Sequence, residues 1–319
     1  MKILANDGLD QSGIDALTQQ GFEVITTKVP QESLKDFINE HQVRTVLVRS
    51  ATQIRKELID ECPCLEIIGR GGVGMDNIDV EYARSKGIHV INTPSASSAS
   101  VAELVFAHLF SGARFLEDSN RKMPLVGDTQ FAELKKSYSK GIELRGKTIG
   151  IVGMGRIGQE VAKIALGLGM RVIAADSNIG KASIKVDFYN KQFINVEIET
   201  EPLSDVIIHS DFITLHVPAQ KGGYMIGKNE FDKMKKGVAV INCSRGGVID
   251  ENALIEALNS GQVSFAGLDV FENEPVPSRA ILEHPKISLT PHVGASTVEA
   301  QDRIGLSLAE QICSILKVQ

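Results

Sequence analysis

The sequence has no long apolar run. Nowhere in its 319 residues does a continuous apolar stretch approach the roughly 20 residues that a membrane-spanning helix needs. The N-terminal Met-Lys-Ile-Leu-Ala-Asn-Asp ends its apolar stretch after three residues, which is too early for a signal-peptide core. The sequence therefore predicts a protein without a membrane span and with a cytoplasmic location.

The sequence also lacks an excess of basic residues. Lys and Arg number 34 against 40 Asp and Glu, which gives a formal net charge of −6 at pH 7. A chain devoted to nucleic acid or to anionic membranes usually carries a basic excess instead. We expect neither of these partners.

Cysteine is scarce. The four cysteines are Cys62 and Cys64, in a Cys-Pro-Cys segment, and the isolated Cys243 and Cys313. Cys62 and Cys64 would suit a metal or redox pair, but no second Cys/His pair at zinc spacing accompanies them. We expect four reduced thiols and no metal site, with a metal or redox role for Cys62 and Cys64 as the alternative.

Short apolar segments alternate with amphipathic ones in the first ninety residues, and the length of the chain predicts two domains. The expected strands are Lys2–Ala5, Glu23–Thr26, Thr45–Val48, Ile67–Ile68 and His89–Ile91. Helices are expected near 11–19, 31–39, 55–61 and 79–86. This alternation predicts an α/β fold with a parallel sheet covered by helices on both faces.

A long helix and a second α/β segment follow. The helix begins after a turn at 93–98, and its apolar positions share one face: Val101, Leu104, Val105, Leu109 and Leu116. Further strands are expected at 148–152, 171–175, 212–216, 238–242, 265–268 and 287–289, with helices from 158 to about 168 and over 296–316. The polar segments 118–145 and 178–200 are expected to be a solvated connection and a surface loop.

A glycine-rich turn follows the strand at 148–152 and opens a helix. Gly153, Gly155 and Gly158 match the dinucleotide-binding fingerprint, in which the free N–H groups of the helix N-terminus bind the pyrophosphate. Asp176 ends the next strand 18 residues after Gly158, where a carboxylate can bind both ribose hydroxyls and repel a 2′-phosphate. The alternative is a purely structural turn, but the combination predicts NAD as cofactor, in preference to NADP.

Three further side chains are candidates for catalysis. Arg245 follows the strand at 238–242, Glu274 lies in a later loop, and His292 follows the last strand. Alone, each has a plainer interpretation: a surface ion pair, a solvated carboxylate and a core histidine. Together they supply a guanidinium to bind a 2-hydroxy acid, a histidine to move the hydroxyl proton and a glutamate to orient it.

Eight segments spread over nearly the whole chain share residues and order with one known family. They are VRSAT at 48–52, IGRGGVGMDN at 68–77, NTP at 92–94, SVAEL at 100–104, GMGRIG at 153–158, NCSRGGVID at 242–250, LDVFENEP at 268–275 and PHVGAST at 291–297. The chain resembles the NAD-dependent D-2-hydroxyacid dehydrogenases. The resemblance places the family's catalytic residues on Arg245, Glu274 and His292.

The same resemblance implies cofactor and substrate contacts. The cofactor contacts, besides the three glycines and Asp176, would be Arg156, Ile157, Val217, Cys243, Ser244, Asp269, Gly294 and Ala295. Asp269 would face the nicotinamide carboxamide. The substrate contacts would be Arg49, Ser50, Arg70, Gly71 and Gly72. Arg49 and Arg70 follow apolar strands and would bind a carboxylate and a phosphate, unless they are ordinary surface arginines.

The resemblance also implies two doubly wound domains. Residues 99–292 would form a Rossmann cofactor domain, and 1–98 with 293–319 a discontinuous flavodoxin-like substrate domain, in a homodimer. The expected reaction is oxidation of D-3-phosphoglycerate to 3-phosphohydroxypyruvate, on the route to serine. The alternatives are a glyoxylate/hydroxypyruvate reductase and, from a different class, an NAD-sensing corepressor-like scaffold. The chain stops at Gln319, so we expect no C-terminal regulatory domain, and Val73 replaces a threonine found in some relatives.

Overall fold

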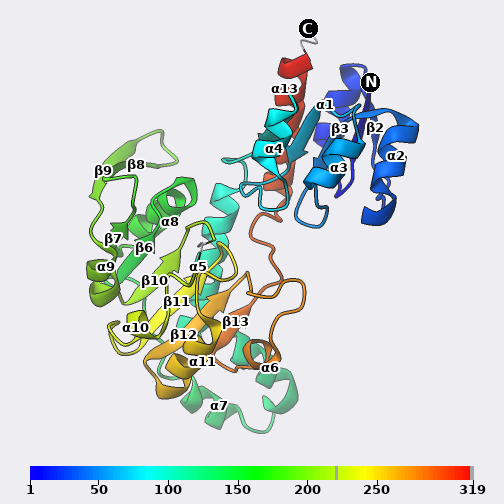
Figure 1. Ribbon diagram of the computed structural model, residues 1–319. Helices are drawn as coiled ribbons and strands as arrows, with labels where there is room; N and C mark the ends of the chain where they lie inside the picture. Colours follow the sequence, from blue (N-terminus) through cyan, green and yellow to red (C-terminus); the bar gives the residue numbers. More distant parts are fainter. Residues whose placement is uncertain (220–221, 317–319) are drawn as a thin grey trace. The chain divides into compact units, whose positions relative to one another are not determined.

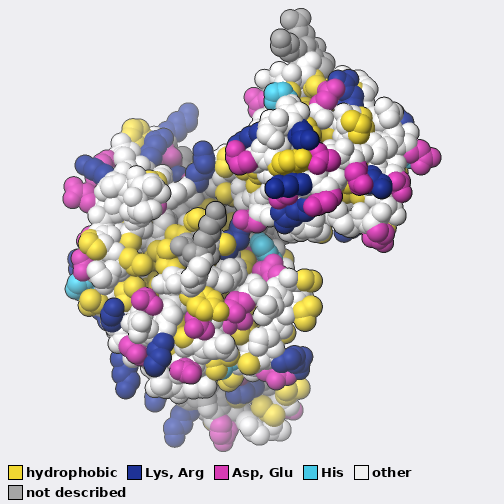
Figure 2. All heavy atoms as spheres, in the orientation of Figure 1, with side chains coloured by type: hydrophobic (Ala, Val, Ile, Leu, Met, Phe, Trp, Pro, Cys, Tyr) yellow, Lys and Arg dark blue, Asp and Glu magenta, His cyan; other side chains and the backbone are white. Residues whose placement is uncertain are grey.

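The computed structural model describes residues 1–219 and 222–316, and these form two compact units (Figure 1). Unit 1 comprises Met1–Ser100 and Ala295–Gln319, and unit 2 comprises Val101–Gly294. Both units contain a parallel sheet, which confirms the predicted α/β fold. Charged side chains of both signs are intermixed on the face shown in Figure 2.

Unit 1 is built on a five-stranded parallel sheet in the order β2-β1-β3-β4-β5, which is the flavodoxin-like order. Its strands are β1 (Lys2–Ala5), β2 (Glu23–Ile25), β3 (Val43–Val48), β4 (Ile67–Arg70) and β5 (His89–Asn92). Its helices are α1 (Gln11–Gln19), η1 (Gln31–Ser33), α2 (Leu34–His41), α3 (Lys56–Glu61), α4 (Val80–Ser85) and α13 (Val298–Leu316). Nearly all residues of β1, β3 and β4 are buried, because helices cover both faces of the sheet.

The last helix, α13, returns to unit 1 and packs on α1. Gly13 and Gly305 meet at this crossing, where a Cβ on Gly13 would stand 2.7 Å from the Cα of Gly305. The two helix backbones can approach this closely because neither residue has a side chain. The buried side chains of Ile304, Leu308 and Ile312 on α13 then contribute to the core beneath the sheet.

Unit 2 is built on a six-stranded parallel sheet in the order β13-β12-β11-β10-β6-β7. Its strands are β6 (Thr148–Val152), β7 (Arg171–Ala175), β10 (Phe212–Leu215), β11 (Val238–Asn242), β12 (Val263–Leu268) and β13 (Ile287–Leu289). Its helices are α5 (Ser98–Arg114), which begins in unit 1, α6 (Leu116–Val126), α7 (Phe131–Ser137), α8 (Arg156–Gly167), α9 (Leu203–His209), α10 (Lys228–Phe231), α11 (Glu251–Ser260) and α12 (Arg279–Leu282).

The segment 178–200 is not the loop that we expected. It forms an antiparallel hairpin of β8 (Lys181–Asp187) and β9 (Phe193–Glu199), drawn in green at the edge of unit 2 in Figure 1. On β8, buried Ala182 and Ile184 alternate with exposed residues, so one face packs on the core of the unit. The alternation of apolar and polar residues was present in the sequence, but charged residues on the outer face made the segment look uniformly polar.

The segment 118–145 also differs from the expected solvated connection, because it contains most of α6 and all of α7. The long helix ends at Arg114, and Phe115 adopts a left-handed conformation with φ of 54°, so Leu116 lies on α6 and not on the face of α5. Residues of α6 are all at least partly exposed, and ion pairs one turn apart, Glu117–Arg121 and Asp118–Lys122, lie along it. A helix without a buried face leaves no apolar period to find.

Among the described residues, no single helix is long and apolar enough to cross a bilayer. The pair α5 and α6 meets the criterion of length and composition only when taken together, and a bend of 56° separates the two helices.

Candidate active site

The glycine turn after β6 forms the cradle that a dinucleotide requires. Gly153 has φ of +98°, and a Cβ on it would overlap the carbonyl of His216, while a Cβ on Gly158 would overlap the carbonyl oxygen of Gly153. Gly155, by contrast, has no atom within 4 Å of the place where its Cβ would stand. It is also the N-cap of α8 and provides no side-chain cap, so the first N–H groups of the helix remain available for an anion. The residues present therefore fit a bound pyrophosphate.

Asp176 lies beside this turn, directly after β7. Its Oδ2 accepts a hydrogen bond from the backbone N–H of Met154 at 2.7 Å, and its Oδ1 accepts from Asn178 at 2.8 Å and Ile179 at 3.0 Å. A carboxylate has about four acceptor positions, so these three bonds leave capacity for a ribose hydroxyl. Asp176 thus also holds the glycine turn to the loop that follows β7, which the sequence did not indicate.

The other expected cofactor residues of unit 2 border the same turn or the neighbouring strand ends. Arg156 and Ile157 form the first turn of α8. Val217 follows β10, and its Cγ1 would lie 3.1 Å from a Cβ on Gly153. Cys243 is buried after β11, and burial together with the charge of Asp269 raises the pKa of its thiol well above the usual value. This thiol therefore stays protonated and uncharged, and it acts as a small apolar side chain beside the end of β11.

Arg245 is held in a short loop after β11 by a buried asparagine. Asn242 accepts hydrogen bonds at its Oδ1 from the N–H of Ser244 (3.0 Å) and from its hydroxyl (2.8 Å). Its Nδ2 donates to the carbonyl oxygen of Arg245 at 2.9 Å. The guanidinium in turn donates through Nη1 to the carbonyl of Ser244 at 2.7 Å. The backbone that carries the arginine is therefore fixed on both sides.

Glu274 and His292 form a hydrogen-bonded pair. The Nδ1 of His292 lies 2.8 Å from Oε2 of Glu274, and Oε1 of the same carboxylate accepts from the N–H of Phe271 at 3.0 Å. The imidazole and the carboxyl side chains are 38% and 35% exposed. With Nδ1 occupied, the Nε2 atom of this partly exposed ring is the nitrogen that remains for a substrate. His292 itself has φ of 55°, in the left-handed region.

The loops that carry the three candidate catalytic residues follow β11, β12 and β13, which are neighbours in the sheet. The first two loops are in close contact, since a Cβ on Gly246 would overlap the carbonyl group of Phe271. Glu251 and Glu272 fasten the second loop to α11 by accepting from each other's backbone N–H at 2.8 and 3.0 Å. The structure therefore brings the expected residues together at the carboxyl end of one sheet.

Asp269 connects the end of β12 to the loop of His292. It is 1% exposed and accepts three hydrogen bonds, from the hydroxyl of Thr290 and from the N–H groups of Val293 and Gly294. The N–H of Asp269 donates to the carbonyl of Asn242 at 3.0 Å. Asp269 thus supports the backbone on both sides of the candidate site.

In unit 1, the structure brings Arg49 and Arg70 together at the carboxyl ends of β3 and β4. Asn77 connects them, because its Oδ1 accepts from Nε of Arg70 at 3.3 Å and its Nδ2 donates to the carbonyl of Arg49 at 2.8 Å. The Arg49 guanidinium also donates to Gln301 on α13. Burial lowers the pKa of Arg49, and the charges of Asp7 and Asp10 act in the opposite direction.

The remaining expected residues lie beside these arginines. Ser50 follows Arg49 on the surface, and the N–H of Gly71 donates to the carbonyl of Val48 at 2.9 Å. A Cβ on Gly72 would stand 2.5 Å from Nη1 of Arg70, so this glycine leaves room for the guanidinium. The carbonyl of Ala295 accepts from Nε2 of Gln301 at 2.6 Å.

Several residues that hold the site together were not predicted from the sequence. They are Asn77, Asn242, Thr290 and Gln301, whose roles depend on hydrogen bonds to backbone or side chains of other segments. Only Asn242 had a local signal, because an asparagine two residues before Ser244 can bond to that residue's N–H. In the described part of the chain there is no group of three His, Cys, Asp or Glu residues that could hold a metal.

Comparison with known proteins places these observations in one family. The model for the D-isomer specific 2-hydroxyacid dehydrogenase NAD-binding domain matches residues 106–294, and this confirms NAD as the predicted cofactor. A D-3-phosphoglycerate dehydrogenase of Methanocaldococcus jannaschii is 40% identical over 318 residues, which make up 99% of this chain and 58% of that protein. A hydroxypyruvate reductase of Thermotoga maritima is 40% identical over 316 residues, 98% of this chain and 97% of that protein.

A solved structure agrees over both units. The crystal structure of the TT0316 protein from Thermus thermophilus matches with a TM-score of 0.84 at 28% identity, covering 99% of this chain and 97% of that one. By contrast, the chain spans little more than half the length of the D-3-phosphoglycerate dehydrogenases that it matches.

Proposed function

Because this chain belongs to the D-isomer specific 2-hydroxyacid dehydrogenase family, we propose that it is an NAD-dependent enzyme oxidising D-3-phosphoglycerate to 3-phosphohydroxypyruvate. The observation that carries the proposal is the Glu274–His292 hydrogen bond, with Arg245 on the neighbouring loop and a dinucleotide cradle in the same unit. A histidine oriented through Nδ1 by a carboxylate has its other nitrogen ready to exchange a proton with a hydroxyl.

In this reaction Arg245 binds the substrate carboxylate and polarises the oxygen on C2. The Nε2 atom of His292 takes the proton of the C2 hydroxyl, while Glu274 holds the ring through Nδ1. Bound NAD would supply the acceptor for the hydride that leaves C2. In the reverse direction the protonated His292 returns the proton to the oxygen of the 2-keto acid.

The proposed cofactor site uses residues of the cradle and of the neighbouring strand ends. They are Gly153, Gly155, Arg156, Ile157, Gly158, Asp176, Val217, Cys243, Ser244, Asp269, Gly294 and Ala295. The available N–H groups of α8 would hold the pyrophosphate, Asp176 the adenosine ribose and Asp269 the nicotinamide carboxamide.

The choice of a phosphorylated substrate rests on Arg49 and Arg70. Asn77 holds the guanidinium of Arg70 and the backbone carbonyl of Arg49, so the two arginines lie at neighbouring strand ends. Two guanidinium groups placed in this way favour a ligand with two anionic groups, and Ser50, Gly71 and Gly72 lie beside them. The relative named D-3-phosphoglycerate dehydrogenase supports this substrate. The hydroxypyruvate reductase has the same sequence identity to this chain as that dehydrogenase and is matched over nearly its full length. It supports the second candidate, which is reduction of hydroxypyruvate or glyoxylate.

A panel of 2-keto acids separates these candidates. The purified protein is assayed for NADH oxidation with 3-phosphohydroxypyruvate, hydroxypyruvate, glyoxylate and pyruvate. We expect kcat/KM for the phosphorylated acid to exceed the others by about two to four powers of ten. Equal use of hydroxypyruvate or glyoxylate would favour the reductase instead. Binding of NADH without any turnover would favour an NAD-sensing scaffold over both.

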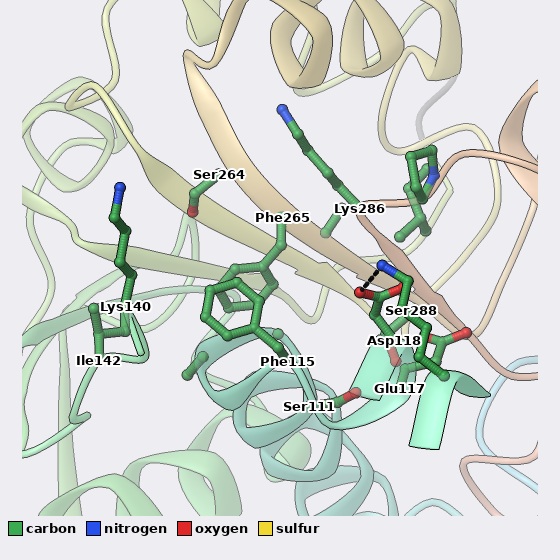
Figure 3. A pocket seen from close by; sticks show the side chains of 16 residues that line it. Ser111, Phe115, Glu117, Asp118, Lys140, Ile142, Ser264, Phe265, Lys286 and Ser288 are labelled. Atoms are coloured by element: carbon green, nitrogen blue, oxygen red, sulfur yellow. Dashed lines mark hydrogen bonds and ion pairs between the residues drawn. The ribbon is translucent and has the colours of Figure 1, made fainter. Parts of the chain in front are cut away.

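We further propose a second copy of this chain as partner. Exposed apolar side chains gather on α5, α6 and α7, namely Phe110, Leu116, Met123, Leu125 and Phe131. A cavity of about 360 Å³ lies in the same region, lined by the rings of Phe115 and Phe265 and bordered by Lys140 and Lys286 (Figure 3). Apolar groups clustered in this way usually mark an interface.

Sedimentation velocity tests the second copy as partner. We expect a dimer for the wild type and a monomer for Leu125→Asp, because Leu125 is 78% exposed and a charge there would be buried on association. A monomeric wild type at micromolar concentration would reject it. The cytoplasmic location stays a prediction.

A further inference from the structure

His108, on α5, is a buried histidine that the proposed reaction does not use. It is 2% exposed, with Nδ1 at 2.9 Å from Oγ of Ser288 and Nε2 at 3.1 Å from Oγ1 of Thr290. Gly267 on β12 makes room for it, since a Cβ there would stand 2.6 Å from the Cβ of His108. Both ring nitrogens are therefore engaged, and the ring lies directly against the β12 backbone.

The hydrogen bonds around His108 have a single direction. The hydroxyl of Thr290 donates to Oδ1 of Asp269 at 2.6 Å, and a hydroxyl has only one hydrogen. Towards His108, Thr290 can therefore only accept, so Nε2 of His108 must carry a hydrogen. Burial lowers the pKa of His108, which keeps the ring neutral at pH 7. Its Nδ1 then accepts from the hydroxyl of Ser288.

The chain of donors ends at the loop of His292. Asp269 accepts from Thr290 and from the N–H groups of Val293 and Gly294, the two residues after His292. On the other side, the N–H of His292 donates to the carbonyl of Thr290 at 3.1 Å. The left-handed conformation of His292 is costly for a residue with a side chain, so it persists only if the flanking backbone is held.

We propose that His108 is a positioning residue, which as the neutral Nε2–H tautomer directs the Thr290 hydroxyl onto Asp269 and so fixes the loop of His292. The role rests on the proposed function, because positioning matters only if His292 exchanges the proton. Without the Nε2–H donor, the Thr290 hydroxyl is free to rotate away from Asp269. The carboxylate then loses one of the three bonds that hold it.

Three variants separate positioning from packing. His108→Leu removes both hydrogen bonds, and His108→Gln places an amide N–H near the position of Nε2. Val105→Ala, on a fully buried residue one turn earlier on α5, perturbs the same core without touching the hydrogen bonds. For His108→Leu we expect kcat to fall about tenfold to hundredfold, as small misplacements of reacting groups do, with KM nearly unchanged.

The melting temperature serves as the second measurement. We expect His108→Leu to lower the melting temperature no more than Val105→Ala does. For kcat, Val105→Ala should keep the wild-type value and His108→Gln should recover most of it. Wild-type kcat in His108→Leu, or equal losses in the leucine and glutamine variants, would overturn the proposal. If His108→Leu does not fold, Thr290→Val replaces it, with the same loss of kcat expected.

A measurement without turnover distinguishes failure of this inference from failure of the proposed function. Nitrogen-15 NMR of the histidine rings in the ligand-free wild type reports the tautomer of His108, assigned by comparison with His108→Gln. We expect a neutral Nε2–H ring at pH 7.5. An Nδ1–H or a charged ring would overturn the inference even if the enzyme is active. An Nε2–H ring in a protein that reduces none of the 2-keto acids would leave the hydrogen-bond chain standing and reject only the reaction.

Discussion

Gly246 lies against the carbonyl group of Phe271 so closely that a Cβ on it would overlap both the carbon and the oxygen. The two residues belong to different loops, one carrying Arg245 and the other Glu274. At this contact the loop of Arg245 lies directly against the loop of Glu274. A side chain at position 246 would force the two loops apart.

We therefore expect Gly246→Ala to lower the free energy of unfolding by about 3 kcal/mol and kcat by about a hundredfold. Gly247→Ala is the matched control. Gly247 has φ of +74° and no atom within 4 Å of its Cβ position, so alanine there costs only about 1–2 kcal/mol of backbone strain. Urea denaturation and steady-state kinetics on both variants measure the difference, and equal effects of the two would show that the loop contact is unimportant.

Removing the imidazole tests the proton transfer. His292→Ala should lower kcat by about 10²–10⁴, the usual contribution of general acid–base catalysis. Affinity for NADH, followed by fluorescence titration, should change little, because the cradle around Gly153 lies on other loops. Loss of NADH binding together with kcat would assign His292 to cofactor binding instead.

Removing only the charge of the carboxylate tests the orienting role. In the wild type both oxygens of the carboxylate are used, one by the N–H of Phe271 and one by Nδ1 of His292. The amide of Glu274→Gln has a single oxygen and cannot accept on both sides, so the imidazole should lose its fixed orientation and kcat should fall about tenfold to hundredfold. Steady-state kinetics measure the change, and a wild-type kcat would remove Glu274 from this role.

Asp176 should decide the choice of cofactor. We expect kcat/KM with NADH to exceed that with NADPH at least tenfold, about 1.4 kcal/mol in transition-state binding. Asp176→Ala should narrow the ratio, and it should also destabilise the protein, because three backbone N–H groups lose their acceptor. Ser177→Ala is the control and should leave the ratio intact, since the Ser177 hydroxyl accepts from the side chain of Asn178 and not from the glycine turn in the described part of the chain. Equal use of both cofactors by the wild type would reject the assignment.

Arg70→Lys should affect phosphorylated substrates selectively. An ammonium cannot reproduce the planar guanidinium or the Nε bond to Asn77, so kcat/KM for 3-phosphohydroxypyruvate should fall about tenfold or more. Hydroxypyruvate reduction should remain comparatively intact. The control is Arg44→Lys. Arg44 lies at the start of β3 and pairs with Glu66 on the surface, so this variant should keep the wild-type kcat/KM for both substrates. A uniform loss on all four 2-keto acids would contradict a phosphate site.

Buried His216 should make stability depend on pH. Burial lowers its pKa from 6.5 to about 3, so the unfolded chain binds a proton that the folded protein refuses. The contribution is fully present above pH 6.5 and is lost as the pH falls from 6.5 towards 3. Between pH 7.5 and 5 this loss amounts to about 2 kcal/mol in the free energy of unfolding. In urea denaturation the loss between these two pH values should be about 2 kcal/mol smaller in His216→Gln than in the wild type, whereas the surface variant His209→Gln should behave as the wild type.

The sequence predicted the elements whose signals are local. The apolar strands are buried on both faces, and the glycine turn with Asp176 needs only residues within one βαβ segment. The hairpin β8–β9 was missed because charged residues occupy its outer face, and α6 because no face of it is buried. A periodic pattern of apolar residues reflects burial of one face, so it cannot reveal a helix or strand that buries few residues.

The hydrogen bonds that organise the candidate site were beyond the reach of the sequence. His108 bonds to Ser288 and Thr290, which are 180 and 182 residues away, and Arg49 to Gln301, which is 252 residues away. No local pattern marks such pairs, because any buried histidine or arginine can find its partner only after the strands and helices have packed. The resemblance indicated the residues that we propose as reacting groups, and the structure shows the hydrogen bonds that hold their loops.

Every proposed catalytic group, with Asp176, belongs to unit 2, whereas Arg49 and Arg70 belong to unit 1. With the proposed roles, the residues that break the C–H bond and the residues that select the substrate acid are encoded by separate segments of the gene. Mutations in the segments around 49 and 70 could then give rise to new substrate ranges while the chemistry is inherited unchanged. A family with this arrangement can diversify by duplication and drift of one part, and a laboratory evolution campaign would begin with libraries confined to those two segments.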